Sequence, residues 1–284
     1  MNIILIQMRT NILSMKKIFI PILITPVLII FTAFFILPVA QLAVKSVQGP
    51  HIFSTYVTML TTDRYLETLF YTVILSLGVT LVTVIISGIS GVFLQRNEFY
   101  GKNILVAMLT FPLAFPGVVV GFMIILLAGR QGLIGNVSKA ISGEKIVLAY
   151  SMAGLFLGYI YFSIPRVITT VMAAAEKIDP RLEEAALSLG ASTWQVTRDV
   201  LVPALSPALV SAGAICFATA MGAFGTAFTL ATDIDVLAVV IYTEFTLSAN
   251  ITMASALSIF LGIITWGVLS LARLSTGETL AASG

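Results

Sequence analysis

Few side chains in this sequence have the types and spacing that catalysis requires. It has one histidine, His51, and one cysteine, Cys216, which stands inside an apolar stretch. Proton transfer or metal-assisted hydrolysis needs several Asp, Glu or His side chains within reach of one another, and no such set is evident. The sequence also lacks a GxxxxGK[ST] phosphate loop. We therefore predict no catalytic residues, no metal site and no cofactor bound by this chain.

Hydroxyl side chains recur along two apolar stretches. Between residues 68 and 94 they stand three or four positions apart, a spacing that places them on one face of a helix. A second set follows between residues 211 and 229. Close packing of small and hydroxylated residues explains such stripes in membrane helices, and a weakly polar transport path is the alternative. The candidate path residues are Ser76, Thr80, Thr83, Ser87, Thr219 and Thr226.

Charged residues are concentrated between positions 176 and 203. Asp179 and the proline after it predict a capped helix start, and Gly190 predicts the end of that helix. Ser192 and Gln195 have the form of a capping box that opens a second helix, which we expect Pro203 to end. Two short capped helices form a rigid element suited to docking onto another protein.

Membrane helices must position these residues. The 284 residues are 58% hydrophobic and 10% charged, with a mean hydropathy of +1.06. Soluble domains carry about 25% charged residues. Apolar runs of about 20 residues cross a bilayer, and backbone groups in lipid must bond internally, so the runs predict an all-α, polytopic membrane protein. The six predicted spans are 18–44, 68–94, 104–128, 146–171, 208–231 and 251–272.

Basic residues indicate the orientation of the spans. Ten of the 15 Lys and Arg residues fall on the side that holds the N-terminus, which predicts that both termini are cytoplasmic. We place Arg166 near the cytoplasmic border of its span, so that no basic residue lies deep in the membrane. The predicted parts are a tail at 1–17, one transmembrane domain at 18–274 with a coupling loop at about 176–203, and a tail at 275–284. No cleavage pattern follows the first run, so we read it as a retained span, not a signal peptide.

The second half of the charged segment resembles the EAA motif of permease subunits of ATP-binding-cassette (ABC) importers. That motif reads Glu-Ala-Ala, three residues, Gly, nine residues, then Ile, any residue, Leu and Pro. The residues that match it by identity and spacing are Glu184, Ala185, Ala186, Gly190 and Pro203. Val200 and Val202 replace the usual Ile and Leu. Residues 95–102 and 111–121 resemble a basic turn and a proline-rich span of the same family.

The resemblance implies a coupling helix between the fourth and fifth spans, with Arg181 on it, that fits a cytoplasmic ATPase subunit. It implies a bacterial inner-membrane complex of two ATPase subunits, which hold ATP–Mg, a second permease subunit and a periplasmic or lipid-anchored substrate-binding protein. A net charge of +2 gives no indication of nucleic-acid binding.

The substrate stays open at this point. Residues 217–230 resemble the branch that serves sulfate, molybdate, phosphonates, iron(III) and polyamines. Ala223 stands where many oxyanion permeases of that branch have an acidic residue. Asp233, Asp235 and Glu244 gather toward the predicted outer face, where a cation site is one explanation and a solvated loop that contacts the binding protein is the one we favour. An ion-driven transporter is a rival, but it would leave the capped cytoplasmic segment unexplained.

Overall fold

The computed structural model describes residues 24–49, 51–230 and 234–276, and every regular element in them is helical. Six helical stretches are long and apolar enough to cross a membrane, which confirms the predicted fold class. They are Ile24–Ser46, Asp63–Arg96, Gly117–Ser142, Met152–Glu176, Thr193–Met221 and Ile251–Ser275. The predicted N-terminal tail and Asp233 lie outside the described residues.

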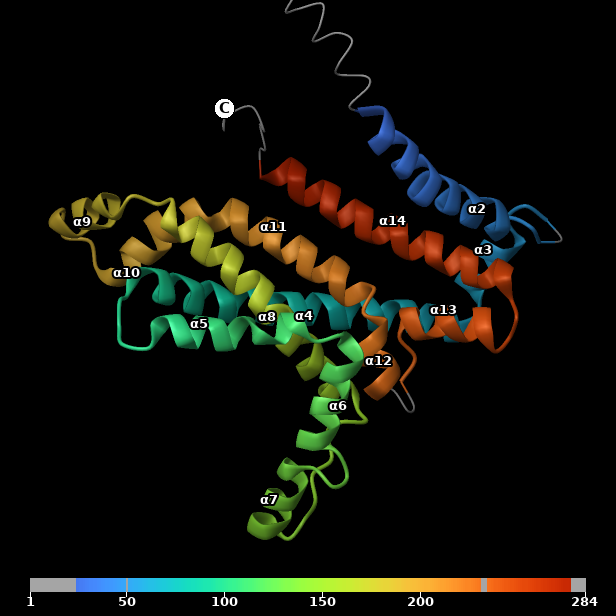
Figure 1. Cartoon of the computed structure of the whole chain (residues 1–284), viewed down its shortest axis with the longest axis horizontal. Coiled ribbons are helices and arrows are strands. Elements are labelled where there is room, and N and C mark those ends of the chain that lie inside the picture. Colours follow the sequence, from blue (N-terminus) through green and yellow to red (C-terminus); the bar gives the residue numbers. More distant parts are fainter. Residues whose placement is uncertain (1–23, 50, 231–233, 277–284) are drawn as a thin grey trace, which may run out of the picture.

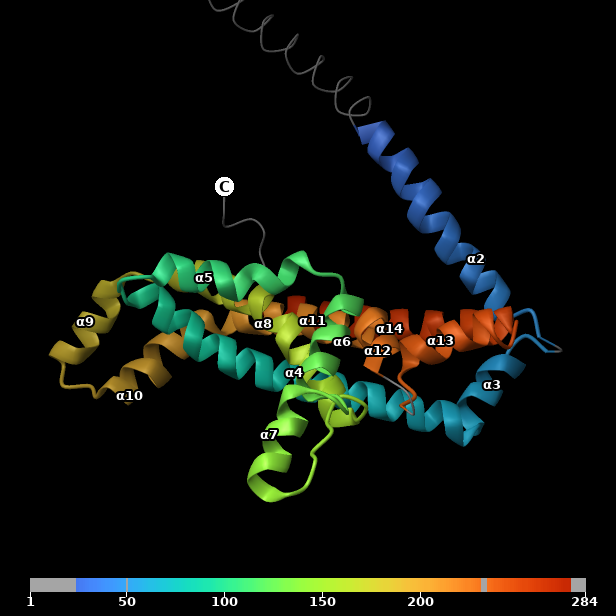
Figure 2. The same cartoon turned by 60° about the horizontal axis from the view of Figure 1, so that its bottom comes forward.

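The helices form an elongated bundle. Helices α4, α8, α11 and α14 run side by side along its long axis, with the short helices α9 and α10 at one end and α3 and α13 at the other (Figures 1 and 2). Helices α6 and α7 project from the side of the bundle. The helix bounds are η1 Thr32–Ile36, α2 Leu37–Ser46, α3 Ser54–Thr61, α4 Asp63–Arg96, α5 Lys102–Thr110, η2 Phe111–Ala114, α6 Gly117–Ala128, α7 Leu133–Ser142, α8 Met152–Glu176, α9 Pro180–Ser188, α10 Thr193–Val196, η3 Thr197–Leu201, α11 Val202–Met221, α12 Phe224–Leu230, α13 Leu237–Thr246 and α14 Ile251–Ser275.

Helix α4 packs closely against α8 because small residues face the contact. A Cβ atom at Gly91 would lie 2.9 Å from Cγ1 of Val171 and 3.2 Å from the carbonyl oxygen of Ile168. Without that Cβ the two helices approach closely, which is how membrane helices gain dispersion contacts. The main hydrophobic core, with buried Val79, Leu155 and Val171, lies between α4, α8 and α11.

Two predicted spans are interrupted in the structure. The run at 104–128 divides at Phe115, whose extended backbone separates η2 from α6, because Pro116 disfavours a helical residue before it. The run at 208–231 divides after Gly222, which caps α11 before α12 begins. The apolar pattern could not reveal these breaks because both sides of each break are equally apolar.

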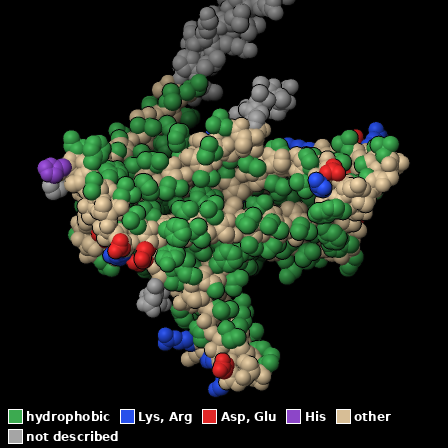
Figure 3. Space-filling model, turned by 180° about the vertical axis from the view of Figure 1, so that it is seen from behind, with side chains coloured by type: hydrophobic (Ala, Val, Ile, Leu, Met, Phe, Trp, Pro, Cys, Tyr) green, Lys and Arg blue, Asp and Glu red, His purple; other side chains and the backbone are tan. Residues whose placement is uncertain are grey.

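The surface matches a membrane environment. Seen from behind, hydrophobic side chains cover most of the bundle, while charged ones gather near its ends and on the projecting α7 (Figure 3). An exposed apolar surface of this extent indicates contact with lipid or with other subunits.

Candidate coupling segment and translocation path

The charged segment folds as two short capped helices, α9 and α10, as predicted. The Asp179 carboxylate accepts a hydrogen bond from the backbone N–H of Arg181 at 3.0 Å, and α9 follows. Gly190 follows the end of α9 and has a φ of +88°, in the left-handed region that favours glycine. Ser192 and Gln195 form the predicted capping box at the start of α10.

The prediction that Pro203 ends the second helix is wrong. Helix α10 continues through the π turn η3 into α11, so one helical stretch runs from Thr193 to Met221. The π turn shifts the hydrogen-bond pattern in the residues just before the proline, which has no N–H to donate. The fifth span is therefore a rigid continuation of the coupling segment.

Helix α9 exposes apolar side chains at the end of the bundle. None of its residues is buried, and Glu184 and Ala185 are exposed while Ala186 is half-buried. The large apolar side chains with more than half of their surface exposed in this segment are Leu182, Leu187, Leu189 and Trp194. These larger residues were not among the predicted docking residues, although they stand beside the motif in the sequence. Charged neighbours and exposed apolar groups together are typical of a surface that binds a soluble protein.

Arg96 joins α4 to this coupling segment. Its Nη2 atom lies 2.7 Å from Oε1 of Glu183 on α9 and donates a hydrogen bond of 3.1 Å to the carbonyl oxygen of Ile178. Each of the two paired side chains is only about one fifth exposed, so this pair is less screened than a surface pair. Residues 97–101 form a turn, as the resemblance at residues 95–102 led us to expect, and Gly101 in it has a φ of +86°.

Most of the candidate path residues on α4 lie inside the subunit. Ser76, Thr83 and Ser87 are fully buried, and Thr80 is half-buried. The Ser87 hydroxyl lies 3.5 Å from the carbonyl oxygen of Ile164 on α8. These positions fit close packing within the chain, the first of the two explanations given above.

The other two candidate path residues, Thr219 and Thr226, differ in burial and in hydrogen-bond partner. Thr226 is buried, and its hydroxyl donates to the carbonyl oxygen of Gly117 at 3.0 Å, which joins α12 to α6. Thr219 on α11 is half-buried and accepts a hydrogen bond of 2.9 Å from Nη1 of Arg166.

Arg166 lies in the interior of α8 and not at either end of the helix. Arg166 is the fifteenth of the 25 residues of α8, so it lies about 21 Å from the first residue and about 15 Å from the last at 1.5 Å per residue. An arginine at the centre of a bilayer costs about 3 kcal/mol on insertion scales, and arginines within membrane spans usually mark a transport pathway. A basic group therefore does lie well inside a span.

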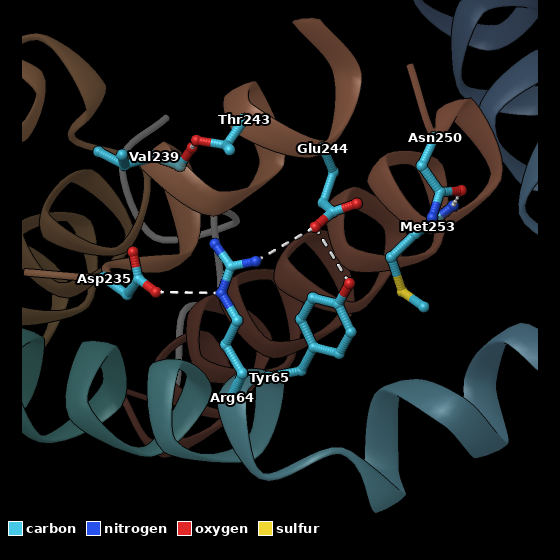
Figure 4. A network of polar contacts seen from close by, with 8 residues as sticks. All are labelled: Arg64, Tyr65, Asp235, Val239, Thr243, Glu244, Asn250 and Met253. Carbon is cyan, nitrogen blue, oxygen red and sulfur yellow. Dashed lines mark hydrogen bonds and ion pairs between the residues drawn. The ribbon is translucent and has the colours of Figure 1, made fainter. Parts of the chain in front are cut away.

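Two acidic residues near the opposite end form a cluster around Arg64 (Figure 4). Arg64 Nε lies 3.2 Å from Oδ2 of Asp235, and its Nη1 lies 3.7 Å from Oε1 of Glu244. The Tyr65 hydroxyl donates to the same Glu244 oxygen at 3.1 Å. Glu244 is buried, so the favoured explanation of a solvated loop is wrong for this residue. The cluster links the start of α4 to α13.

Residues 87–276 match the family described as "Binding-protein-dependent transport system inner membrane component". The chain belongs to this family. It is a multi-pass permease subunit of an ABC importer, and the resemblance seen in the EAA-like residues is confirmed.

Named relatives of this permease cover much of its length. The probable sulfate transport system permease protein cysT of Chlorokybus atmophyticus is 30% identical over 242 residues, which are 81% of this chain and 84% of that protein. The molybdenum transport system permease protein ModB of Escherichia coli (strain K12) is 34% identical over 166 residues, or 57% of this chain and 72% of ModB.

Solved structures share the fold of this permease. A chain of a bacterial alginate ABC transporter, crystallised with an alginate pentasaccharide-bound periplasmic protein, superposes with a TM-score of 0.81 at 17% identity and covers 95% of this chain. A chain of the MetNI methionine ABC transporter gives a TM-score of 0.55 and covers 76% of this chain.

Proposed function

We propose that this permease imports a small tetrahedral oxyanion of the sulfate and molybdate class. The observation that carries the proposal is its similarity to permeases named for sulfate and molybdate transport, which for the cysT relative extends over 81% of this chain. Phosphonate has the same tetrahedral anionic chemistry and belongs to the same class. Ala223, which lacks the acidic group of many oxyanion permeases, uses its carbonyl oxygen to accept a hydrogen bond of 2.7 Å from Tyr159.

The structure gives less support to a cation substrate. Iron(III) or a polyamine would need uncompensated carboxylates on its route. Asp235 and Glu244 share the Arg64 guanidinium, which compensates one of their two negative charges. Within the described residues no group of three or more His, Cys, Asp and Glu side chains could hold a metal ion.

ATP provides the energy on separate subunits in this proposal. Two ATPase subunits, which hold ATP–Mg, dock on the two α9 helices of a permease pair, and this chain contributes no catalytic residue. The exposed apolar side chains of α9 and the exposed motif residue Glu184 support α9 as the docking surface. Arg181 and Pro203 belong to the same coupling segment. Arg181 lies on α9, the proposed docking helix, and Pro203 lies in α11, the helix that continues into the membrane. Closure of the ATPase pair then moves this helix and switches the bundle between two states.

The remaining partners follow from the family and the surface. A substrate-binding protein outside the membrane delivers the anion, in keeping with the family description. The first span, Ile24–Ser46, buries none of its most apolar stretch within the chain. Lipid and a second permease subunit, identical or homologous, would cover it. The orientation in this proposal places α9 and both termini in the cytoplasm of a bacterial inner membrane.

The test combines subunit capture with transport. The permease is purified in mild detergent with its co-expressed ATPase, as wild type, as Leu189→Glu and as a control, Ile141→Glu, which alters an equally exposed residue on α7. We expect ATPase to accompany the wild type and the control and to be lost from Leu189→Glu. The wild-type complex with its binding protein, in liposomes, should take up radioactive sulfate or molybdate only when ATP is supplied to the ATPase side. Uptake of neither anion would overturn the substrate class.

A further inference from the structure

A charged side chain in the interior of a membrane-spanning helix needs a counter-charge, and Arg166 has none among the residues that the structure describes. None of the ion pairs found among the described residues includes Arg166, whereas Arg64 and Arg96 both face carboxylates. One of its N–H groups donates to Thr219, and its guanidinium lies 5.9 Å from the ring centroid of Phe162. The Arg166 side chain is half-buried, so part of it faces out of the subunit.

Thr219 fixes the direction of the guanidinium. Its hydroxyl donates to the carbonyl oxygen of Ile215 at 2.7 Å and accepts from Nη1 of Arg166 at 2.9 Å. The hydroxyl thus anchors one corner of the guanidinium to α11 and leaves the remaining N–H donors of the planar group for another acceptor. Paired N–H groups on one plane match two oxygens of a tetrahedral oxyanion.

A groove begins one helical turn from Arg166. It is lined on α8 by Thr169, Thr170, Ala173 and Lys177, which stand three, four, seven and eleven positions after Arg166 and therefore share its helix face. The α11 side of the groove is formed by Ala204, Pro207 and Ala208. Its volume of about 760 Å³ is within the range of small-ligand sites, about 300–1,000 Å³. Small side chains keep the groove open, and Lys177 places a second positive charge at the end next to α9.

We propose that Arg166, oriented by Thr219, is the contact that holds the oxyanion inside the membrane, and that the anion leaves along the α8–α11 groove toward Lys177. This inference rests on the proposed function, since it assigns a site to the same substrate class. A single guanidinium attracts a dianion without enclosing it, so the anion is held and then released, as passage requires. Thr219 is a positioning residue in this arrangement.

The experiment uses the whole complex in liposomes, with its binding protein and ATP, and measures uptake of radioactive sulfate and molybdate together with ATP hydrolysis. The variants are Arg166→Gln, Arg166→Lys and Thr219→Val, and the control is Arg273→Gln, which removes an exposed arginine at the end of α14. We expect Arg166→Gln to lower uptake at least tenfold while ATP hydrolysis stimulated by the binding protein continues, so that more ATP is used per anion. Arg166→Lys should keep a third or more of the uptake, Thr219→Val should lose three- to tenfold, and Arg273→Gln should match the wild type.

The outcomes separate this inference from the proposed function. If the wild type transports neither anion, the substrate class is wrong and the site fails with it. If the wild type transports an anion and Arg166→Gln transports it equally well, only the site is wrong. If Arg166→Gln assembles normally and uptake and ATP hydrolysis fall together, so that the ATP used per anion is unchanged, the site is wrong. Should Arg166→Gln fail to assemble, Thr219→Val decides, because an unchanged amount of ATP used per anion in that variant contradicts the proposal.

Discussion

Arg96, the last residue of α4, forms an ion pair of 2.7 Å with Glu183 in the first turn of α9. Helix α4 is the longest helix described, and its other end holds the Arg64 cluster. One continuous helix therefore connects the coupling segment to the acidic cluster at the far end of the bundle. If α9 receives the ATPase as proposed, the Arg96–Glu183 pair and the backbone that leads to α11 are two connections from it to the membrane helices.

Breaking the Arg96–Glu183 pair should weaken energy coupling. We expect Glu183→Gln to lower ATP-driven uptake three- to tenfold while the ATPase still co-purifies, because the docking surface of α9 is unchanged. The reversed pair, Arg96→Glu with Glu183→Arg, should recover part of the loss. Glu98→Gln is the control, since it removes an exposed carboxylate from a surface pair worth about 0–1 kcal/mol. Equal uptake by Glu183→Gln and the wild type would show that the pair has no role in coupling.

Gly190 should be needed for its backbone conformation and not for space. Its φ is +88°, and an added Cβ would meet nothing within 4 Å. Gly190→Ala therefore adds only the left-handed strain, about 1–2 kcal/mol, and should reduce the amount of ATPase that co-purifies. Gly190→Asn should be milder, because asparagine tolerates this region better. Gly143→Ala on α7 is the matched control, with a φ of +76° and equally open space. ATPase capture that is the same for all three variants would contradict the prediction.

Replacement of Arg64 and replacement of Glu244 should destabilise the protein by different amounts. Arg64→Gln leaves the buried Glu244 carboxylate with only the Tyr65 hydroxyl, whereas Glu244→Gln leaves a half-exposed arginine that still faces Asp235. An uncompensated buried charge costs more than an exposed one, so Arg64→Gln should be the more destabilising by about 1–2 kcal/mol. Thermal unfolding of the detergent-solubilised permease measures this. The double variant should be more stable than Arg64→Gln alone, and the opposite order would contradict the argument.

Local signals in the sequence were reliable guides to local structure. The caps at Asp179, Gly190 and Ser192 depend on residues within a few positions, and all three are present as predicted. The position of Arg166 within its helix was not evident from the sequence because the apolar run 146–171 ends five residues after it, while the helix continues to Glu176. The helix also begins later than the apolar run, at Met152.

Contacts between distant segments left no signal in the sequence. Glu244 is buried against Arg64, 180 positions earlier in the chain, and nothing near Glu244 indicates this partner. The hydroxyl stripe of α4 has the same spacing whether it faces a path or another helix, so the spacing alone could not show that most of these hydroxyls are buried within the chain.

The close approach of α4 and α8 should make Gly91 intolerant of a single methyl group. A Cβ there would lie 2.9 Å from Cγ1 and 3.0 Å from Cβ of Val171, and the carbonyl oxygen of Ile168 at 3.2 Å cannot move without bending α8. Overpacking of this kind costs about 1–3 kcal/mol.

Gly88, one turn away on the same helix, is the matched control for Gly91→Ala. Its added Cβ would lie 3.6 Å from Cδ2 of Leu209, an ordinary contact. Alanine is the better helix former by about 0.5–1 kcal/mol, so Gly88→Ala should be neutral or stabilising. We expect Gly91→Ala to unfold at a lower temperature than the wild type in detergent and Gly88→Ala at the same or a higher one. Because α8 also holds Arg166, Gly91→Ala should lower uptake even below its unfolding temperature, and equal stability of the two variants would mean that α4 and α8 are not packed as closely as the structure describes.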